Sequence, residues 1–309
     1  MLVMVLLILP LLAGSFPYAP VLALDIIVAI LFAASLHFMM GPGGMPSFGH
    51  AAYFGLGAYG AALLFKTAGW PMMASMAAAP MLAAFGAIVF GWFCVRLSGV
   101  YLAMLTLAFA QIVWSVVYQW DAVTGGSNGI IGIWPADWLS GKAYYYFALV
   151  VVVAAVLVLR RLVFSPFGYA LRATRDSALR ADALGINVQK VQWTAFAIAG
   201  AFAGLAGALY VFSKGSTSPE VVAVGKSVDG LVMVLLGGVQ ALAGPVVGAT
   251  VFTMLQDYVV GITQYWHALF GGVILVLVLA FPQGIAGFLA QRSGSSRAPV
   301  RNDDKREPA

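Results

Sequence analysis

Charged residues and cysteine are both scarce in this chain, and each scarcity excludes a class of protein. Only 9% of the 309 residues are charged and 62% are hydrophobic, and the mean hydropathy is +0.96. Ordinary soluble domains carry about 25% charged residues, so a pair of soluble domains is excluded. The single cysteine, Cys94, can build neither a disulfide framework nor a cysteine–histidine metal cluster.

Motifs for metalloprotease chemistry and for nucleotide binding are missing as well. No H-E-x-x-H pattern occurs, and the acidic residues do not cluster. The GKS at 225–227 lacks the earlier glycine of a P-loop, because Glu220 stands at that position. We therefore predict neither a catalytic site, nor a metal site, nor a bound nucleotide in this chain.

Long hydrophobic runs, in contrast, recur from one end of the chain to the other. About twenty apolar residues in a helix cross the roughly 30 Å of a bilayer's hydrocarbon core. The sequence predicts an all-α, polytopic transmembrane bundle over residues 1–290, with about ten membrane segments, some broken or re-entrant. A polar tail at 291–309 is expected to be disordered. The predicted segments are residues 1–13, 21–40, 47–65, 73–95, 100–120, 143–163, 192–212, 227–241, 244–260 and 264–286.

Basic residues indicate how these segments are oriented. Most of them lie around one loop at 160–190 and in the tail at 292–306. The positive-inside rule places both regions in the cytoplasm, with the two termini, and leaves the segment 121–142 outside. The same distribution explains the net charge of +5 by topology, so no nucleic-acid partner is predicted.

The charged run SPFGYALRATRDSALRADALGINVQK, at 165–190, interrupts this apolar sequence. Ser165 and Pro166 are typical helix-start residues, and Gly185 is a typical stop. At 3.6 residues per turn the run forms one amphipathic helix, in which Asp176 and Arg180 make an i,i+4 ion pair. Its other face consists mainly of alanine and carries no Trp or Phe, which favours docking against protein over lying on lipid headgroups.

This run also carries a family resemblance. ADALG at 181–185 resembles the EAA-type coupling motif of ABC importer permeases, and SPFGYALRATRDSALRADALGINV resembles branched-chain amino acid permeases of the LivM type. The stretches GPGGMPSFGHAAYFGLGAYGAALL, SGVYLAMLTLAFAQIVWSVVYQ, TGGSNGI, AIAGAFAGLAGALY and GLVMVLLGGVQALAGPVVGA agree, so that the resemblance extends to about Ala286. The sequence departs from the family pattern at two places. Glutamate is common in the family near the positions of Ala181 and Asp182. Polar residues are expected at the positions of Met45 and Pro46.

The resemblance implies a transport subunit in a bacterial inner membrane. Its partners would be a LivH-like second permease, two cytoplasmic ATPases that bind ATP-Mg, a periplasmic solute-binding protein and the lipid bilayer. A coupling helix at about 168–185 would meet the ATPase, and this chain would hold no cofactor. The expected coupling residues are Arg172, Arg175, Asp176, Arg180, Ala181, Asp182, Ala183 and Gly185.

A translocation path is expected where membrane helices break, because irregular backbone is tolerated where it lines a cavity or packs in protein. For the glycines the alternative is close helix packing, which is favoured for the pairs Gly200/Gly204 and Gly244/Gly248. For His50 the alternative is a hydrogen-bonded packing role. The candidate path residues are Ser47, Gly49, His50, Gly55, Gly57, Thr106, Gln111, Gly237 and Gly238.

Two questions stay open on the sequence alone. Leucine, isoleucine and valine as substrates follow from the resemblance, and urea, short amides or other amino acids remain alternatives. An ion-coupled secondary transporter is the rival mechanism, because such proteins use ionisable groups within the membrane. Asp25, Asp229 and Asp257 are the carboxylates available for it, and none has an obvious basic partner in the sequence.

Overall fold

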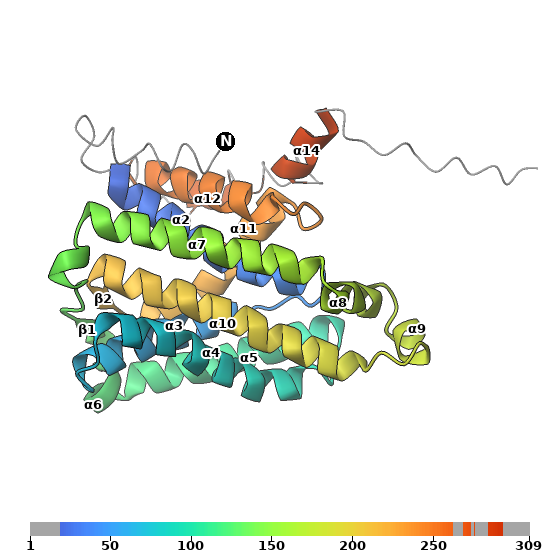
Figure 1. Ribbon diagram of the computed structural model, residues 1–309, viewed down its shortest axis with the longest axis horizontal. Helices are drawn as coiled ribbons and strands as arrows, with labels where there is room; N and C mark the ends of the chain where they lie inside the picture. Colours follow the sequence, from blue (N-terminus) through green and yellow to red (C-terminus); the bar gives the residue numbers. More distant parts are fainter. Residues whose placement is uncertain (1–18, 262–267, 273–274, 276–283, 293–309) are drawn as a thin grey trace, which may run out of the picture.

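A computed structural model of the chain describes residues 19–261, 268–272, 275 and 284–292, and these residues are mostly helical. The helices run along the long axis of an elongated bundle (Figure 1). Among the described residues, five helices are long and apolar enough to span a bilayer. They are α2 (Ala19–Met40), α4 (Met72–Cys94), α5 (Gly99–Gln119), α7 (Lys142–Val163) and α10 (Val188–Lys214).

The remaining membrane-type helices are shorter. They are α3 (His50–Lys66), α11 (Val224–Gly237), α12 (Gly244–Val260) and α14 (Ile285–Arg292). At 1.5 Å per residue, the 14 residues of α11 reach only about 21 Å, less than the hydrocarbon core. The all-α membrane fold is confirmed, whereas the number of ten segments is not. The predicted segment 1–13, most of 264–286 and most of the tail 291–309 lie outside the described residues.

Helix α10 forms the centre of the bundle and packs against α2, α3 and α4. Small residues allow this close approach: a Cβ atom at Gly57 would collide with the backbone of Gly204, and one at Gly207 with the Phe54 carbonyl. A side chain at Gly200 would likewise meet Ala87 of α4. The packing interpretation of the Gly200/Gly204 pair is therefore confirmed, in line with the role of small residues between membrane helices.

The connections at the two ends of the bundle differ in character (Figure 1). One end holds α6 (Asp121–Thr124), two 3-10 turns, η2 (Gly126–Asn128) and η3 (Asp137–Leu139), and a third, η4 (Pro219–Val222). Here the short strands β1 (Ile130–Ile131) and β2 (Ser216–Thr217) pair antiparallel, with Ile130 opposite Thr217. The opposite end carries α8 (Pro166–Asp176) and α9 (Ala178–Ala183), which come from the charged run.

Candidate functional site

The charged run folds as two helices, α8 and α9, and the prediction of one continuous helix is wrong. Ser165 begins α8, and its Oγ accepts a hydrogen bond from the Gly168 amide. Ser177 adopts an extended conformation, with φ −164° and ψ 105°, and ends α8. Its Oγ then accepts from the Arg180 amide at 3.3 Å and so caps α9. A serine hydroxyl competes with helical hydrogen bonding in this way, which explains the break.

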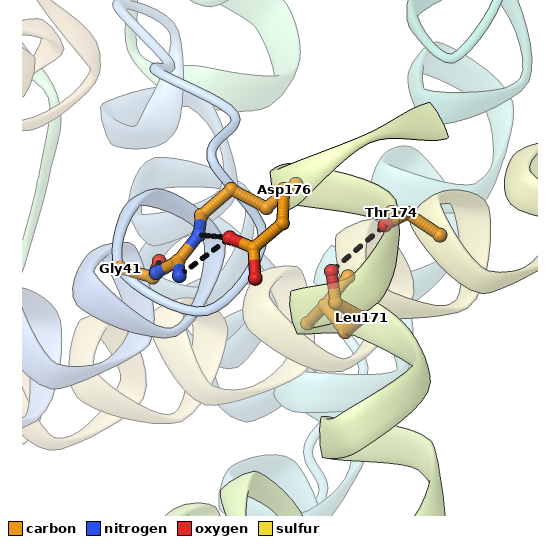
Figure 2. A network of polar contacts seen from close by, with 5 residues as sticks. Gly41, Leu171, Thr174 and Asp176 are labelled. Atoms are coloured by element: carbon orange, nitrogen blue, oxygen red, sulfur yellow. Dashed lines mark hydrogen bonds and ion pairs between the residues drawn. The ribbon is translucent and has the colours of Figure 1, made fainter. Parts of the chain in front are cut away.

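The break also changes the expected ion pair. An i,i+4 contact between Asp176 and Arg180 needs an unbroken helix, and Ser177 interrupts it. Asp176 Oδ1 instead accepts from Nε and Nη2 of its neighbour Arg175, at 2.9 and 2.8 Å. The third contact of that guanidinium leaves the helix, because Nη1 donates to the Gly41 carbonyl at 2.8 Å. Figure 2 shows Asp176 and Gly41 on opposite sides of the same group.

This guanidinium links α8 to the loop between α2 and α3. Gly41 directly follows α2, and Gly44, with φ +63°, lies so close to the aliphatic stem of Arg175 that a Cβ atom would collide with it. One turn earlier in α8, Arg172 Nη2 donates to the Val163 carbonyl at the end of α7, at 3.0 Å. Helix α8 is therefore connected by arginine to two membrane segments.

The interior of α8 is anchored by apolar burial. The Leu171 side chain is completely buried, and its carbonyl accepts a 2.8 Å hydrogen bond from Thr174 Oγ1, drawn in Figure 2. Both residues belong to the turn that precedes Arg175. If α8 moves as a rigid unit, Arg175 therefore moves with it and pulls on the Gly41 carbonyl.

Helix α9 projects from the bundle and exposes apolar side chains. Leu179 is 83% exposed and Leu184 is 80% exposed, whereas Ala181 is buried. The charged Arg180 and Asp182 are also exposed, and Gly185 ends the segment with φ +81°. A groove of about 270 Å³ between α8 and α9 is lined by Ala173, Asp176, Ser177, Arg180, Ala181 and Leu184.

Four of the predicted path residues gather at the start of α3: Ser47, Gly49, His50 and Thr106. All three polar side chains are buried. The Phe48 amide donates to Thr106 Oγ1 at 3.1 Å, and the Ala51 amide donates to Ser227 Oγ of α11 at 2.9 Å. Side chains of α5 and α11 thus accept from two backbone amides at this helix N-terminus, and the Ala51 amide belongs to the first turn, where a helix offers no internal partner.

His50 is completely buried in this cluster. Ser35 Oγ lies 2.7 Å from the Phe32 carbonyl, to which it can donate, and forms a 2.8 Å hydrogen bond with His50 Nε2. The other ring nitrogen of His50, Nδ1, has no hydrogen-bond partner among the described residues. The ring also lies 5.4 Å from the ring of Phe32.

The other predicted path residues lie elsewhere. Gly57 packs on Gly204, and Gly55 packs on Val222 of η4, so the packing explanation fits both. Gln111 is exposed on α5. Gly237 and Gly238 form the turn between α11 and α12, where Gly238 takes φ 102°.

A mixed-charge pocket, which was not predicted, lies between α2, α10, α11 and α12. Lys214 Nζ forms an ion pair with Asp25 at 2.8 Å, although the two residues are 189 positions apart in sequence. This pair corrects the expectation that Asp25 lacks a basic partner. The pocket measures about 360 Å³ and also receives Lys226 and Asp257.

Neither a hydrolase site nor a metal site is found in the part of the chain that the structure describes. The GGSNG run at 125–129 matches the letters of the G-x-S-x-G motif, but it forms the turn from α6 through η2 and not a strand-to-helix elbow. Among these described residues, no group of three His, Cys, Asp or Glu side chains could hold a metal ion.

Comparison with known proteins agrees with this architecture. The family model of the permease component of branched-chain amino acid transport systems matches residues 18–279. The permease protein LivM of the high-affinity branched-chain amino acid transport system of Escherichia coli (strain K12) is 27% identical over 287 residues, which cover 84% of this chain and 67% of that protein. LivM of Salmonella typhimurium gives the same identity and coverage.

A more distant similarity covers a smaller part of the chain. The autoinducer 2 import system permease protein LsrC of Shigella flexneri is 30% identical over 128 residues, 39% of this chain and 37% of that protein. No solved structure matches the chain. The match to the family model covers most of the sequence and includes every helix from α2 to α12. The chain therefore belongs to the family of branched-chain amino acid transport permease components, and it is a permease of the LivM type.

Proposed function

We propose that this multi-pass protein of the bacterial inner membrane is the permease subunit of an ATP-driven ABC importer for leucine, isoleucine and valine. Membership of the family, and the branched-chain amino acid transport systems to which the LivM relatives belong, support the substrate class. The observation that carries the mechanism is the arginine contact between α8 and the Gly41 carbonyl, because it ties a surface helix to a membrane segment.

Helices α8 and α9 together form the coupling element, at about 168–185. The exposed Leu179 and Leu184 offer an apolar contact to a cytoplasmic ATPase, and Arg180 and Asp182 surround them with charges of both signs. Interfaces of this kind bury an apolar centre within a polar rim. ATP-Mg binds to the ATPases and not to this chain.

The coupling element acts on the membrane segments through Arg175. Closure of the ATPases displaces α9, and α8 moves with it because only Ser177 separates the two helices and they pack against each other. The guanidinium then carries the motion to Gly41, nine residues before His50 at the start of α3. Helix α3 in turn packs along α10, so a shift of its N-terminus reaches the centre of the bundle.

The remaining subunits are assigned by the same proposal. A LivH-like second permease pairs with this chain, and two ATPases bind at the α8–α9 end, where both termini lie in the cytoplasm. A periplasmic solute-binding protein docks at the opposite end, on the loops at 121–142 and 213–226. Pairing of β1 with β2 joins these two loops into one surface.

Uptake by the reconstituted complex tests this function. We expect proteoliposomes that contain the permease, its co-purified ATPase and the binding protein to accumulate leucine only with ATP-Mg, and to keep doing so in the presence of an ionophore. Accumulation by this chain alone, abolished by the ionophore and indifferent to ATP, would instead establish the ion-coupled carrier.

A further inference from the structure

The mixed-charge pocket lies at the end of the bundle opposite the coupling element. Asp25 stands in the second turn of α2, Lys214 ends α10, and Lys226 stands in the first turn of α11. Asp257 comes from the last turn of α12. Four helices that are far apart in sequence thus place two carboxylates and two ammonium groups around one cavity.

The charged residues of this pocket stand near the ends of their helices, whereas Phe32 and Met233 stand about two turns further along α2 and α11. Asp25 and Lys214 neutralise each other at 2.8 Å. The Lys226 ammonium lies 5.9 Å from the centre of the Phe54 ring, within the range of a cation–π contact. A lysine held in this way keeps its three hydrogens available for an anionic group. Gln256 adds an amide next to Asp257.

Apolar side chains form most of the rest of the wall, to which Tyr210 and Thr253 add two hydroxyl groups. Leu22, Val28, Phe32 and Met233 line the cavity together with the Phe54 ring. A volume of about 360 Å³ falls within the usual range of small-molecule sites, which are mostly apolar with a few converging polar groups. A ligand that matches this lining carries both charges at one end and an aliphatic group at the other.

We propose that this pocket is a binding site of the permease itself for a zwitterionic aliphatic amino acid. Lys226 receives the α-carboxylate, Asp257 and the Asp25 carboxylate that already pairs with Lys214 accept hydrogen bonds from the α-ammonium group, and the apolar side chains receive the aliphatic group. The proposal rests on the proposed function and deepens it, because such a site selects amino acids over urea and amides, which carry no separated charges.

The pocket also connects with the rest of the mechanism. Phe32 and Phe54 form part of its wall. Phe32 also contacts the His50 ring, on the side of α2 where Ser35 forms its hydrogen bond with His50. The cluster at the start of α3 therefore lies directly behind the pocket. A shift of α3 driven through Gly41 would reach the pocket through these two aromatic rings.

The test is direct binding to the complete permease–ATPase complex in nanodiscs, without the solute-binding protein. Saturation-transfer NMR with L-leucine reports contact of the methyl groups with the protein. We expect a signal for the natural complex, at least a tenfold weaker affinity in Lys226→Gln, and near-natural binding in Lys226→Arg, since one charge-assisted hydrogen bond accounts for a factor of this size. Lys142→Gln, an exposed lysine at the same end, is the matched control and should bind as the natural complex does.

Two leucine analogues test the contributions of the two charged groups of the ligand one at a time. Leucinamide lacks the carboxylate and 4-methylpentanoate lacks the ammonium group, so each should bind at least tenfold more weakly than leucine. Binding of leucine unchanged by Lys226→Gln, equal binding of either analogue, or no leucine contact in the natural complex would each overturn the pocket site. ATP-dependent leucine uptake by the same purified complex, reconstituted in proteoliposomes together with the solute-binding protein, decides the proposed function independently, so the two failures are distinguishable.

Discussion

Replacement of Arg175 and Arg180 together by glutamate is expected to lower ATP-dependent leucine uptake about a hundredfold or more, with normal membrane insertion. The carboxylate introduced at position 175 could not donate to the Gly41 carbonyl, and it would face Asp176, a like charge. Reversal at position 180 would alter the exposed surface of α9 that meets the ATPase. Each charge-assisted hydrogen bond contributes about 1.5–3 kcal/mol, and 1.4 kcal/mol corresponds to a factor of about ten.

Uptake in membrane vesicles, divided by the amount of inserted chain on an immunoblot, measures this effect. Lys190→Glu is the matched control, because it reverses an exposed charge at the start of α10 on the same side of the bundle. Arg175→Lys should give an intermediate rate, since lysine keeps the charge but not the fork that holds Gly41 and Asp176 at once. Natural uptake in the double variant would remove the coupling role from α8 and α9.

Gly57→Val is expected to destabilise the whole bundle. Its side chain would enter the contact between α3 and α10, where the backbone of Gly204 leaves no room for even a Cβ atom. Overpacking of a well-packed core costs about 1–3 kcal/mol, and rigid backbone on both sides places this site at the upper end. We therefore expect the midpoint of thermal unfolding to fall by on the order of 5 °C.

The chain contains its own reporter for this measurement. Cys94 is the only cysteine and is completely buried, so a thiol-reactive dye becomes fluorescent only when the bundle opens. Gly225→Ala serves as the control, because a Cβ atom at that position meets open space. Equal unfolding midpoints for Gly57→Val and Gly225→Ala would show that α3 and α10 do not need their close approach.

Hydropathy predicted the helices well because burial in lipid requires long apolar runs. The prediction of 244–260 coincides with α12, and 100–120 differs from α5 by one residue at each end. Composition also placed the charged run on the surface. A helix that is apolar all round gives no signal for which face points inward, however, and this explains why Gln111 was grouped with Ser47 and His50 although it is exposed.

Contacts between distant segments could not be predicted from the sequence, for a different reason. The ion pair of Asp25 with Lys214 depends on how α2 and α10 pack, which no local pattern encodes. The break at Ser177 did leave a local signal, since serine directly before ALRADA is a good N-cap. The amphipathic periodicity across the same residues predicted a continuous helix instead. In the structure, the Ser177 hydroxyl caps α9 and the helix is interrupted.

Cross-linking from α9 tests the central claim most directly. Because Cys94, the single cysteine of this chain, is buried, Leu179→Cys gives the permease one accessible thiol, to which a photoactivatable maleimide can be attached before the complex is assembled. The account predicts that this position captures the ATPase subunit, identified by mass spectrometry, whereas Trp138→Cys at the opposite end, where Trp138 is 70% exposed, does not. Capture of the ATPase from position 138 and not from 179 would contradict the assignment of α8 and α9 as the coupling element.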